Sequence, residues 1–340
     1  MMKTEDFNYN LPENFIAQTP IEPRHNSRLL VLDRKKDTVC HHLFWQLDEL
    51  LHPNDLLVIN KTRVIPARII AHKQPGGGRV EILLLRKQSE LEWVCMVGGS
   101  GLIPGKRVQI ENGPVAEIME ILDGPQRIIR FDLPIEPFFP VVGYVPLPPY
   151  IHEKLGDPER YQTVYATLPG SAAAPTAGLH FTPELILKMK EKGFQFAEVT
   201  LHVGLDTFAP VNEDDPGEHI IHKEWCNIPS DTVEMVNTTR QKGGRVIAVG
   251  TTSVRTLESA ADHENRGFIK EFSGDTGLFI LPGYSFNVVD AMITNFHLPK
   301  STLLMLVSAF AGRERILNAY EVAKSEAYRF FSFGDAMLIL

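Results

Sequence analysis

The apolar residues of this chain follow two different spacings in different regions. In residues 1–62, and again from residue 146, apolar runs typical of buried strands alternate with apolar residues at helical spacing. Asp55-Leu-Leu-Val-Ile-Asn60 predicts a strand covered on both faces, whereas His41–Leu51 carries leucines at helical spacing and predicts a helix. This alternation predicts an α/β (mixed α+β) main domain.

Residues 63–145 show a different pattern. Short runs rich in strand-forming residues are separated by turn residues, and no helical period links them. The pattern favours a small closed barrel or a sandwich. We expect a roughly six-stranded antiparallel β-barrel, inserted into a discontinuous main domain of residues 1–62 and 146–340. The predicted strands are Ala67–Lys73, Arg79–Arg86, Leu91–Val97, Arg107–Glu111, Val115–Ile121 and Arg127–Phe131.

The stretch Ala172–Phe208 is predicted to bring two histidines to the ends of neighbouring elements. Thr182 suits the N-cap of a helix and Pro183 its first position, and His180 lies just before them. The strand that follows this helix carries His202 near its end. In α/β folds such loops hold chemistry more often than packing residues, so we expect a functional site here.

A second strand–turn–helix unit begins with the apolar run Val246–Val249. Gly250 is expected to make the turn, and one of the residues Thr251–Ser253 is expected to cap the helix. The free N–H groups at such a helix start suit a carboxylate or a phosphate. Arg255 opposes the helix dipole unless it faces an anion. The alternative is an ordinary surface ion pair with Glu258 at i, i+3 spacing.

Histidines in loops and at element ends leave a metal site open as an alternative. Neutral imidazole is a common metal ligand, so a histidine-metal-dependent hydrolase of a small molecule is the competing function. The sequence has no H-E-x-x-H motif, and a histidine is more often a hydrogen-bonded or substrate-contacting group, so we expect no metal. The five histidines are His180, His202, His219, His222 and His297.

Composition narrows the class of protein. A chain of 340 residues suggests two domains, and no apolar run reaches the roughly 18 residues that span a bilayer. The polar, acidic start predicts no signal peptide. The three cysteines are scattered, which favours a reducing cytoplasm. The net charge of −8 excludes a protein that binds nucleic acid over its whole surface, but not one with a local basic face.

One segment departs from the acidic balance of the chain. Between Lys61 and Lys87 there are seven basic residues against one acid, Glu81. A solvated barrel face would explain them, and contact with nucleic-acid phosphates is the other interpretation.

Several motifs occur together and in order, and with them the chain resembles the S-adenosylmethionine:tRNA ribosyltransferase-isomerase family of queuosine biosynthesis. The resemblance spans nearly the whole length. One departure is Asp206, where the family usually has glycine. The motifs are Asn60-Lys-Thr-Arg-Val-Ile-Pro-Ala-Arg68, Pro146-Leu-Pro-Pro-Tyr-Ile151, Tyr161-Gln-Thr-Val-Tyr165, Ala174-Pro-Thr-Ala-Gly-Leu-His-Phe181, Val199-Thr-Leu-His-Val-Gly204, Val249-Gly-Thr-Thr-Ser-Val-Arg255, Thr294-Asn-Phe-His-Leu-Pro299 and Arg329-Phe-Phe-Ser-Phe-Gly-Asp-Ala336.

The resemblance implies a reaction. The ribosyl part of S-adenosylmethionine passes to 7-aminomethyl-7-deazaguanine at the tRNA wobble position, rearrangement gives epoxyqueuosine, and adenine and methionine leave. S-adenosylmethionine is then consumed as a co-substrate, and no cofactor is expected. The expected partner is the tRNA anticodon arm carrying the precursor. We also expect a cytoplasmic monomer with no membrane or obligate protein partner.

The resemblance also suggests roles for residues. The sulfonium acidifies the C5′ hydrogens, so the enzyme needs a base of near-neutral pKa and an acid for adenine departure. We expect proton transfer by His180, His202 and His297. The expected substrate-binding residues are Thr176, Gly178, Thr207, Thr252, Ser253 and Arg255, and the expected tRNA-binding residues are Lys61, Arg63 and Arg68.

Overall fold

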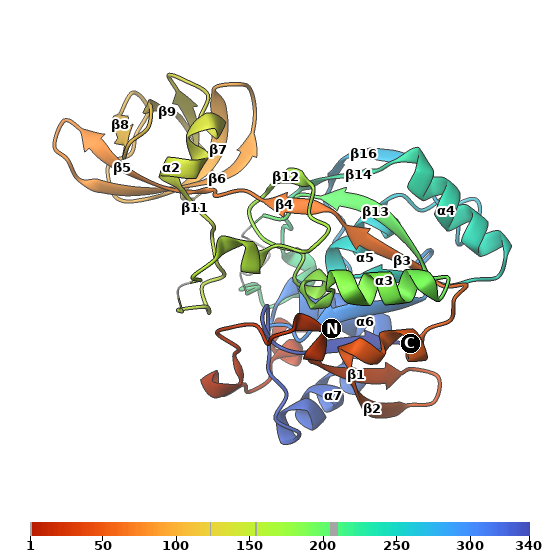
Figure 1. Cartoon of the computed structure of the whole chain (residues 1–340). Helices are drawn as coiled ribbons and strands as arrows, with labels where there is room; N and C mark the ends of the chain where they lie inside the picture. The colour runs from red at the N-terminus through yellow and green to blue at the C-terminus, as the bar shows by residue number, and fades with distance from the viewer. Residues whose placement is uncertain (1, 123, 154, 205–209) are drawn as a thin grey trace. The chain divides into compact units, whose positions relative to one another are not determined.

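The computed structural model describes residues 2–122, 124–153, 155–204 and 210–340. The chain forms two compact units (Figure 1). We call the first the body; it comprises Met1–Thr62, Pro149–Leu168 and Ala174–Leu340. We call the second the barrel; it comprises Arg63–Pro148 and a short return segment, Pro169–Ala173, which the sequence alone does not set apart.

The predicted antiparallel β-barrel is confirmed. Its strands pair in the order β5-β6-β7-β10-β9-β8, and β8 pairs back with β5, so the sheet closes. Buried side chains such as Ile69, Ala71, Val80 and Ile82 fill the interior. The strands are β5 (Arg68–Gln74), β6 (Arg79–Lys87), β7 (Glu92–Gly98), β8 (Arg107–Ile110), β9 (Val115–Ile121) and β10 (Gln126–Phe131), and β11 (Gly143–Tyr144) follows the short helix α2 (Phe139–Val142) and pairs with β5.

Within the described residues, the body contains one nine-stranded mixed sheet of order β16-β14-β13-β3-β15-β17-β18-β1-β2. Its centre is a run of parallel strands, β13-β3-β15-β17. The strands are β1 (Arg28–Asp33), β2 (Thr38–Leu43), β3 (Leu56–Asn60), β13 (Gln195–Leu201), β14 (Glu224–Ile228), β15 (Val246–Val249), β16 (Phe272–Thr276), β17 (Ala291–Asn295) and β18 (Ala336–Ile339). A separate two-stranded sheet pairs β4 (Thr62–Val64) with β12 (Leu168–Ser171).

Helices cover both faces of the body sheet (Figure 1). Alternate residues of one strand serve opposite cores: Leu57 and Ile59 pack toward α1 and α3, whereas Leu56 and Val58 pack toward α4, α5, α6 and α7. Among the described residues, none of the helices combines the length and apolar character that crossing a bilayer requires. The helices are α1 (Leu47–Leu50), α3 (Pro183–Glu191), α4 (Ser230–Gln241), α5 (Thr251–Ser259), α6 (Thr302–Ala311) and α7 (Arg313–Ser325).

The helix predicted over His41–Leu51 is wrong in its first part. Residues up to Leu43 belong to the edge strand β2, which pairs antiparallel with β1 through a tight turn. Asp37 in that turn has φ 55°, a left-handed conformation that Asp adopts more readily than most residues. The turn commits the chain to a hairpin, and helical structure begins only after residue 43.

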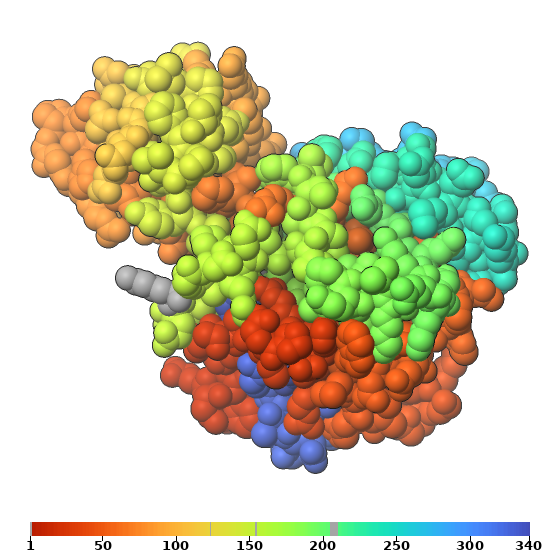
Figure 2. Space-filling model, in the orientation of Figure 1, coloured from red at the N-terminus to blue at the C-terminus, as the bar shows by residue number. Residues whose placement is uncertain are grey.

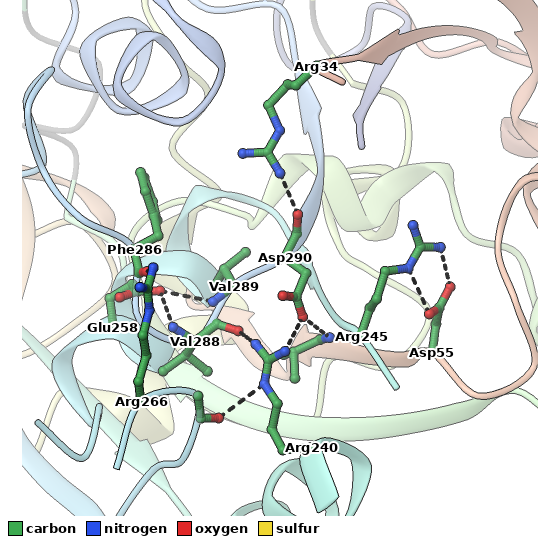
Figure 3. Close-up of polar contacts among 12 residues, drawn as sticks. Arg34, Asp55, Arg240, Arg245, Glu258, Arg266, Phe286, Val288, Val289 and Asp290 are labelled. Atoms are coloured by element: carbon green, nitrogen blue, oxygen red, sulfur yellow. Dashed lines mark hydrogen bonds and ion pairs between the residues drawn. The ribbon is translucent and has the colours of Figure 1, made fainter. Parts of the chain in front are cut away.

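Charged side chains hold the amino-terminal edge of the parallel strands (Figure 3). Arg245, just before β15, makes two hydrogen bonds to Asp55, just before β3, at 2.9 and 2.6 Å. Asp290, just before β17, accepts from the Val246 amide at 2.7 Å and pairs with Arg240. Bidentate and backbone-directed contacts of this kind fix strand starts relative to one another, so the carboxyl ends of these strands also meet at one edge.

The N-terminal residues cover part of the edge where the parallel strands end. On the face of the body seen in Figure 2, the N-terminal residues (red) border the residues of the α3 segment (green). Arg24 donates to the Leu179 carbonyl, and His25 Nδ1 lies 2.6 Å from Thr182 Oγ1. Thr182 also caps α3, as predicted, by accepting from the Leu185 amide at 3.3 Å. These contacts bury the segment that carries His180.

Candidate active site

The candidate site lies where β13, β3, β15 and β17 end. Because these strands are parallel, the residues that follow them meet at one edge of the sheet, the usual place for ligands in α/β folds. That edge receives His202 after β13, Thr62 after β3, Gly250 after β15 and His297 after β17. The predicted loop positions of His202, Gly250 and His297 therefore all lie at this edge.

His202 is the most accessible of the three predicted proton-transfer histidines. Its Nδ1 lies 2.8 Å from Thr62 Oγ1, and its ring stacks on Trp225 with centroids 5.2 Å apart and planes at 23°. Among the described residues, Nε2 has no hydrogen-bond partner. Partial burial lowers the pKa of His202 below its usual value, so the imidazole is neutral at pH 7 and can accept a proton.

Asn60 ties the ends of β3 and β13 together. Its side-chain oxygen accepts from the amides of Leu201 and Thr62, each at 3.1 Å, and its amide donates to the Leu201 carbonyl at 3.0 Å. Asn60 and Thr62 are both completely buried. The Asn60 side chain thus continues the hydrogen-bonding between β3 and β13 past their last backbone pair. It also fixes Thr62, whose hydroxyl contacts His202.

Asn295, at the end of β17, is a site residue that the sequence pattern alone does not indicate. Its oxygen accepts from Thr176 Oγ1 at 3.1 Å, and its amide donates to His180 Nε2 and to the Phe331 carbonyl, each at 3.2 Å. Phe331 has φ 68°, an uncommon conformation for a bulky residue. The signal in the sequence is a buried asparagine that ends a mostly apolar strand, as Asn60 ends β3.

His180 has both ring nitrogens engaged. Nε2 accepts from Asn295, so Nδ1 carries the hydrogen and donates to Ser27 Oγ at 2.7 Å. The ring stacks on Phe44 at 5.1 Å. Burial, and then the nearby guanidinium groups of Arg24 and Arg329, lower the pKa of His180 to about 3. His180 is therefore a neutral, buried group that organises the chain around it.

His297 is also buried and neutral. Its Nε2 lies 2.7 Å from Thr294 Oγ1, its backbone amide donates to Tyr320 Oη at 2.9 Å, and its carbonyl accepts from the Tyr9 hydroxyl. Burial lowers the pKa of His297 to about 3. A base with so low a pKa accepts protons poorly at neutral pH, which sets His297 apart from His202.

The start of α5 differs from the prediction that Thr251, Thr252 or Ser253 caps the helix. The N-cap is Gly250, with φ 85°, and no side chain in the described ranges caps the helix. Ser253 Oγ donates to the Val249 carbonyl at 2.8 Å. Thr252 Oγ1 is inaccessible and has no hydrogen-bond partner among the residues described.

Arg255 is paired with Glu224 on β14 rather than facing an open site. Its Nη1 contacts one carboxylate oxygen of Glu224, and its Nε donates to the Leu278 carbonyl at 3.0 Å. The other Glu224 oxygen accepts from the Gly204 amide at 2.9 Å, so the ion pair holds the segment after β13. The alternative of a surface pair between Arg255 and Glu258 is wrong, because both side chains are buried and Glu258 instead accepts backbone amides (Figure 3).

The remaining predicted pocket residues fall into three cases. Thr176 contacts Asn295, as described above. Gly178 is required by packing, since a Cβ there would overlap the hydroxyl of Tyr165 and press on the side chain of Thr163. Thr207 and the unusual Asp206 lie outside the described residues.

Comparison with known proteins places this chain in a family. The model of the family described as queuosine biosynthesis protein matches residues 4–339. The chain belongs to the queuosine biosynthesis protein family. The S-adenosylmethionine:tRNA ribosyltransferase-isomerase of Carboxydothermus hydrogenoformans is 54% identical over 347 residues, covering 100% of both chains. The crystal structure of S-adenosylmethionine tRNA ribosyltransferase from Thermotoga maritima is 41% identical, covers 98% of this chain and 100% of that chain, and superposes with a TM-score of 0.58.

The basic residues that we expect to bind tRNA are divided between the two units of the chain. Lys61 belongs to the body and pairs with Glu198 at 3.0 Å. Arg63 and Arg68 belong to the barrel, where Arg68 pairs with Glu81 at 3.3 Å. Both ion pairs are partly exposed, so they are weak and easily exchanged for contacts with phosphates.

The structure gives no support to the alternative function, a histidine-metal-dependent hydrolase of a small molecule. Across residues 2–122, 124–153, 155–204 and 210–340, no three side chains of His, Cys, Asp or Glu lie close enough together to hold a metal ion. His219, one of the candidate ligands, instead pairs with Glu213 at 2.9 Å and packs edge-on against Phe279.

The buried histidines predict a loss of stability in acid. The folded pKa of about 3 for His180 and His297 lies below the unfolded value of about 6.5, so the unfolded state binds more protons between these values. Their contribution is complete above pH 6.5 and falls as the pH drops, by about 2 kcal/mol per histidine at pH 5.

Urea unfolding at pH 7 and pH 5 measures this loss. A Trp93→Phe background leaves only Trp45 and Trp225, both in the body, as fluorescent reporters. Between pH 7 and pH 5, His180→Asn should lose about 2 kcal/mol less free energy of unfolding than its parent does. An equal free energy of unfolding at both pH values would contradict the assignment of neutral buried histidines.

Proposed function

We propose that this chain transfers the ribosyl part of S-adenosylmethionine to 7-aminomethyl-7-deazaguanine at the wobble position of tRNA. The transferred group is isomerised to the epoxycyclopentanediol of epoxyqueuosine, and adenine and methionine are released. The observation that carries this proposal is the 54% identity, over the full length of both chains, to a relative named S-adenosylmethionine:tRNA ribosyltransferase-isomerase. S-adenosylmethionine acts as a co-substrate, and no further cofactor is proposed.

We assign the proton transfer from C5′ of the sulfonium substrate to His202. The positive sulfur makes these hydrogens acidic, and a neutral imidazole with an accessible nitrogen is a suitable base. In His202, the contact of Nδ1 with Thr62 and the stacking on Trp225 orient the ring, so that Nε2 is left to react. We propose that His180 and His297 position the surrounding chain, since both are buried and neutral.

The other predicted residues support the substrate in different ways. Thr176 and Gly178 shape the wall next to Asn295 and Tyr165. Thr252 has a buried hydroxyl with no hydrogen-bond partner among the described residues, whereas Ser253 and Arg255 act through the helix and the Glu224 ion pair. A role for Thr207 stays a prediction.

We propose that Lys61, Arg63 and Arg68 contact the phosphates of the anticodon arm, with the target base turned out of its stack for reaction. Residues 63–148 contain ten basic and nine acidic side chains, in a chain whose net charge is −8. This segment is therefore close to neutral and repels a polyanion much less than the rest of the chain does. Action as a cytoplasmic monomer is part of the same proposal.

Incubation with S-adenosylmethionine and precursor-bearing tRNA tests the function. We expect free adenine in step with a mass gain on the modified nucleoside. Intact S-adenosylmethionine and unchanged nucleoside after incubation with folded protein would contradict the proposal. tRNA that lacks the aminomethyl precursor is the matched control, and it should yield no adenine.

Replacement of His202 tests the assignment of the base. His202→Asn should lower kcat by about 10²–10⁴-fold, the usual contribution of a general base. The wild-type rate should fall as the pH drops below about 6.5, because protonation removes the base and burial lowers the His202 pKa from that value.

His263→Asn is the control for this variant, because His263 is exposed on a loop beyond α5. It should keep the wild-type rate and pH profile. Near-wild-type turnover in His202→Asn, with an unchanged circular dichroism spectrum, would remove His202 from the mechanism.

Charge reversal tests the tRNA contacts. Arg63→Glu with Arg68→Glu should weaken tRNA binding and flatten its dependence on salt by roughly 0.7–0.9 in log–log slope per lost phosphate contact. Arg130→Glu is the matched control, since Arg130 pairs with Glu92 on a different part of the same barrel. Binding and salt dependence equal to the wild type in the double variant would rule out this surface.

A further inference from the structure

We propose that the amino end of α5 binds the carboxylate of the amino-acid part of S-adenosylmethionine, with Thr252 as its side-chain donor. This inference rests on the proposed function, which supplies the substrate, and it assigns one subsite of the same site.

The turn at Gly250 and the nine-residue helix α5 that follows it present unused backbone donors. Gly250 occupies the N-cap with φ 85° and ψ 155°, and it has no side chain with which to cap the helix. The first helical hydrogen bond runs from the Val254 amide to the Gly250 carbonyl. The amides of Thr251, Thr252 and Ser253 therefore precede the helical ladder, and they have no hydrogen-bond partner in the described part of the chain.

The side chain of Thr252 is a second, independent sign of a ligand. Thr252 is 8% exposed, and its Oγ1 is inaccessible without a hydrogen-bond partner in the described ranges. The neighbouring hydroxyls are satisfied, because Ser253 donates to the Val249 carbonyl and Thr256 donates to the Thr252 carbonyl, both at 2.8 Å. A Cβ added at Gly250 would lie 3.6 Å from Thr252 Oγ1, so the hydroxyl borders the turn that opens the helix.

The charge at this helix start suits a carboxylate. The aligned peptide dipoles supply about half a positive charge at the amino end of a helix. Arg255, the nearest cation in sequence, is neutralised by Glu224, although its Nη2 has no partner among the described residues. Among the described residues, this helix start offers backbone amides and one hydroxyl but no unpaired full charge. Such a set matches a singly charged, planar carboxylate better than a doubly charged phosphate.

The distance between the start of α5 and His202 fits one molecule of S-adenosylmethionine. β15 and β13 are separated by β3, so their ends lie about 10 Å apart at the usual strand spacing. In S-adenosylmethionine, five bonds separate the carboxylate carbon from C5′, which is roughly 6 Å at the advance per bond of an extended chain. A hydrogen bond of about 3 Å at each end bridges the remainder. The carboxylate at α5 and the reacting carbon near His202 are therefore compatible with one bound molecule.

Calorimetric titration with two ligands tests the proposal. The probes are S-adenosylmethionine and its decarboxylated analogue, which has hydrogen in place of the carboxylate. The wild type should prefer S-adenosylmethionine, and Thr252→Val should reduce this preference by about 10-fold or more, as loss of a hydrogen bond to a charged group predicts. Thr252→Ser, which keeps the hydroxyl, should restore the preference.

Thr256→Val is the matched control, because it removes a buried hydroxyl one turn along the same helix and should keep the wild-type preference. An unchanged preference in Thr252→Val, or equal binding of both ligands to the wild type, would overturn the inference alone. Weaker tRNA binding by Thr252→Val with an unchanged preference would also overturn it, and would assign the site to a phosphate. Failure of the wild type to bind S-adenosylmethionine would overturn this inference and the proposed function together.

Discussion

The candidate site depends on the hydrogen bonds that two buried asparagine side chains, Asn60 and Asn295, make at the ends of its strands. A strand that ends inside a protein leaves backbone groups that need partners, and an amide side chain can both donate and accept. Asn60 does this for the join between β3 and β13, and Asn295 does it for the end of β17. Through Thr62 and His180 the same two side chains set the positions of hydroxyl and imidazole groups around the edge.

Burial then separates chemically similar residues into different roles. Three histidines reach the same edge, but His180 and His297 are held neutral by burial, whereas His202 keeps an accessible nitrogen. Burial also pairs the charge of Arg255 with Glu224 inside the body, which leaves the amides and the Thr252 hydroxyl as the donors at the start of α5 among the described residues. The edge therefore combines one proton acceptor with neutral hydrogen-bond donors, as a cationic substrate with its own carboxylate requires.

Local patterns predicted the elements well and their partners poorly. The barrel strands lie within a residue or two of their predicted limits, because turn residues and a period of two are local signals. The edge strand β2 was missed, because pairing with β1 outweighed leucines at helical spacing. The role of His180 depends on Ser27 and Asn295, and that of Arg255 on Glu224, all far away in the sequence. Such long-range contacts leave no local pattern.

The central claim is that proton transfer at this edge belongs to His202, and a deuterium-release experiment tests it most directly. S-adenosylmethionine carrying deuterium at C5′ is incubated with precursor-bearing tRNA, and deuterium appearing in the solvent is measured. We expect the wild type to release deuterium in step with product formation. His202→Asn should still bind S-adenosylmethionine and release no deuterium above background. Release at the wild-type rate by folded His202→Asn would contradict the account.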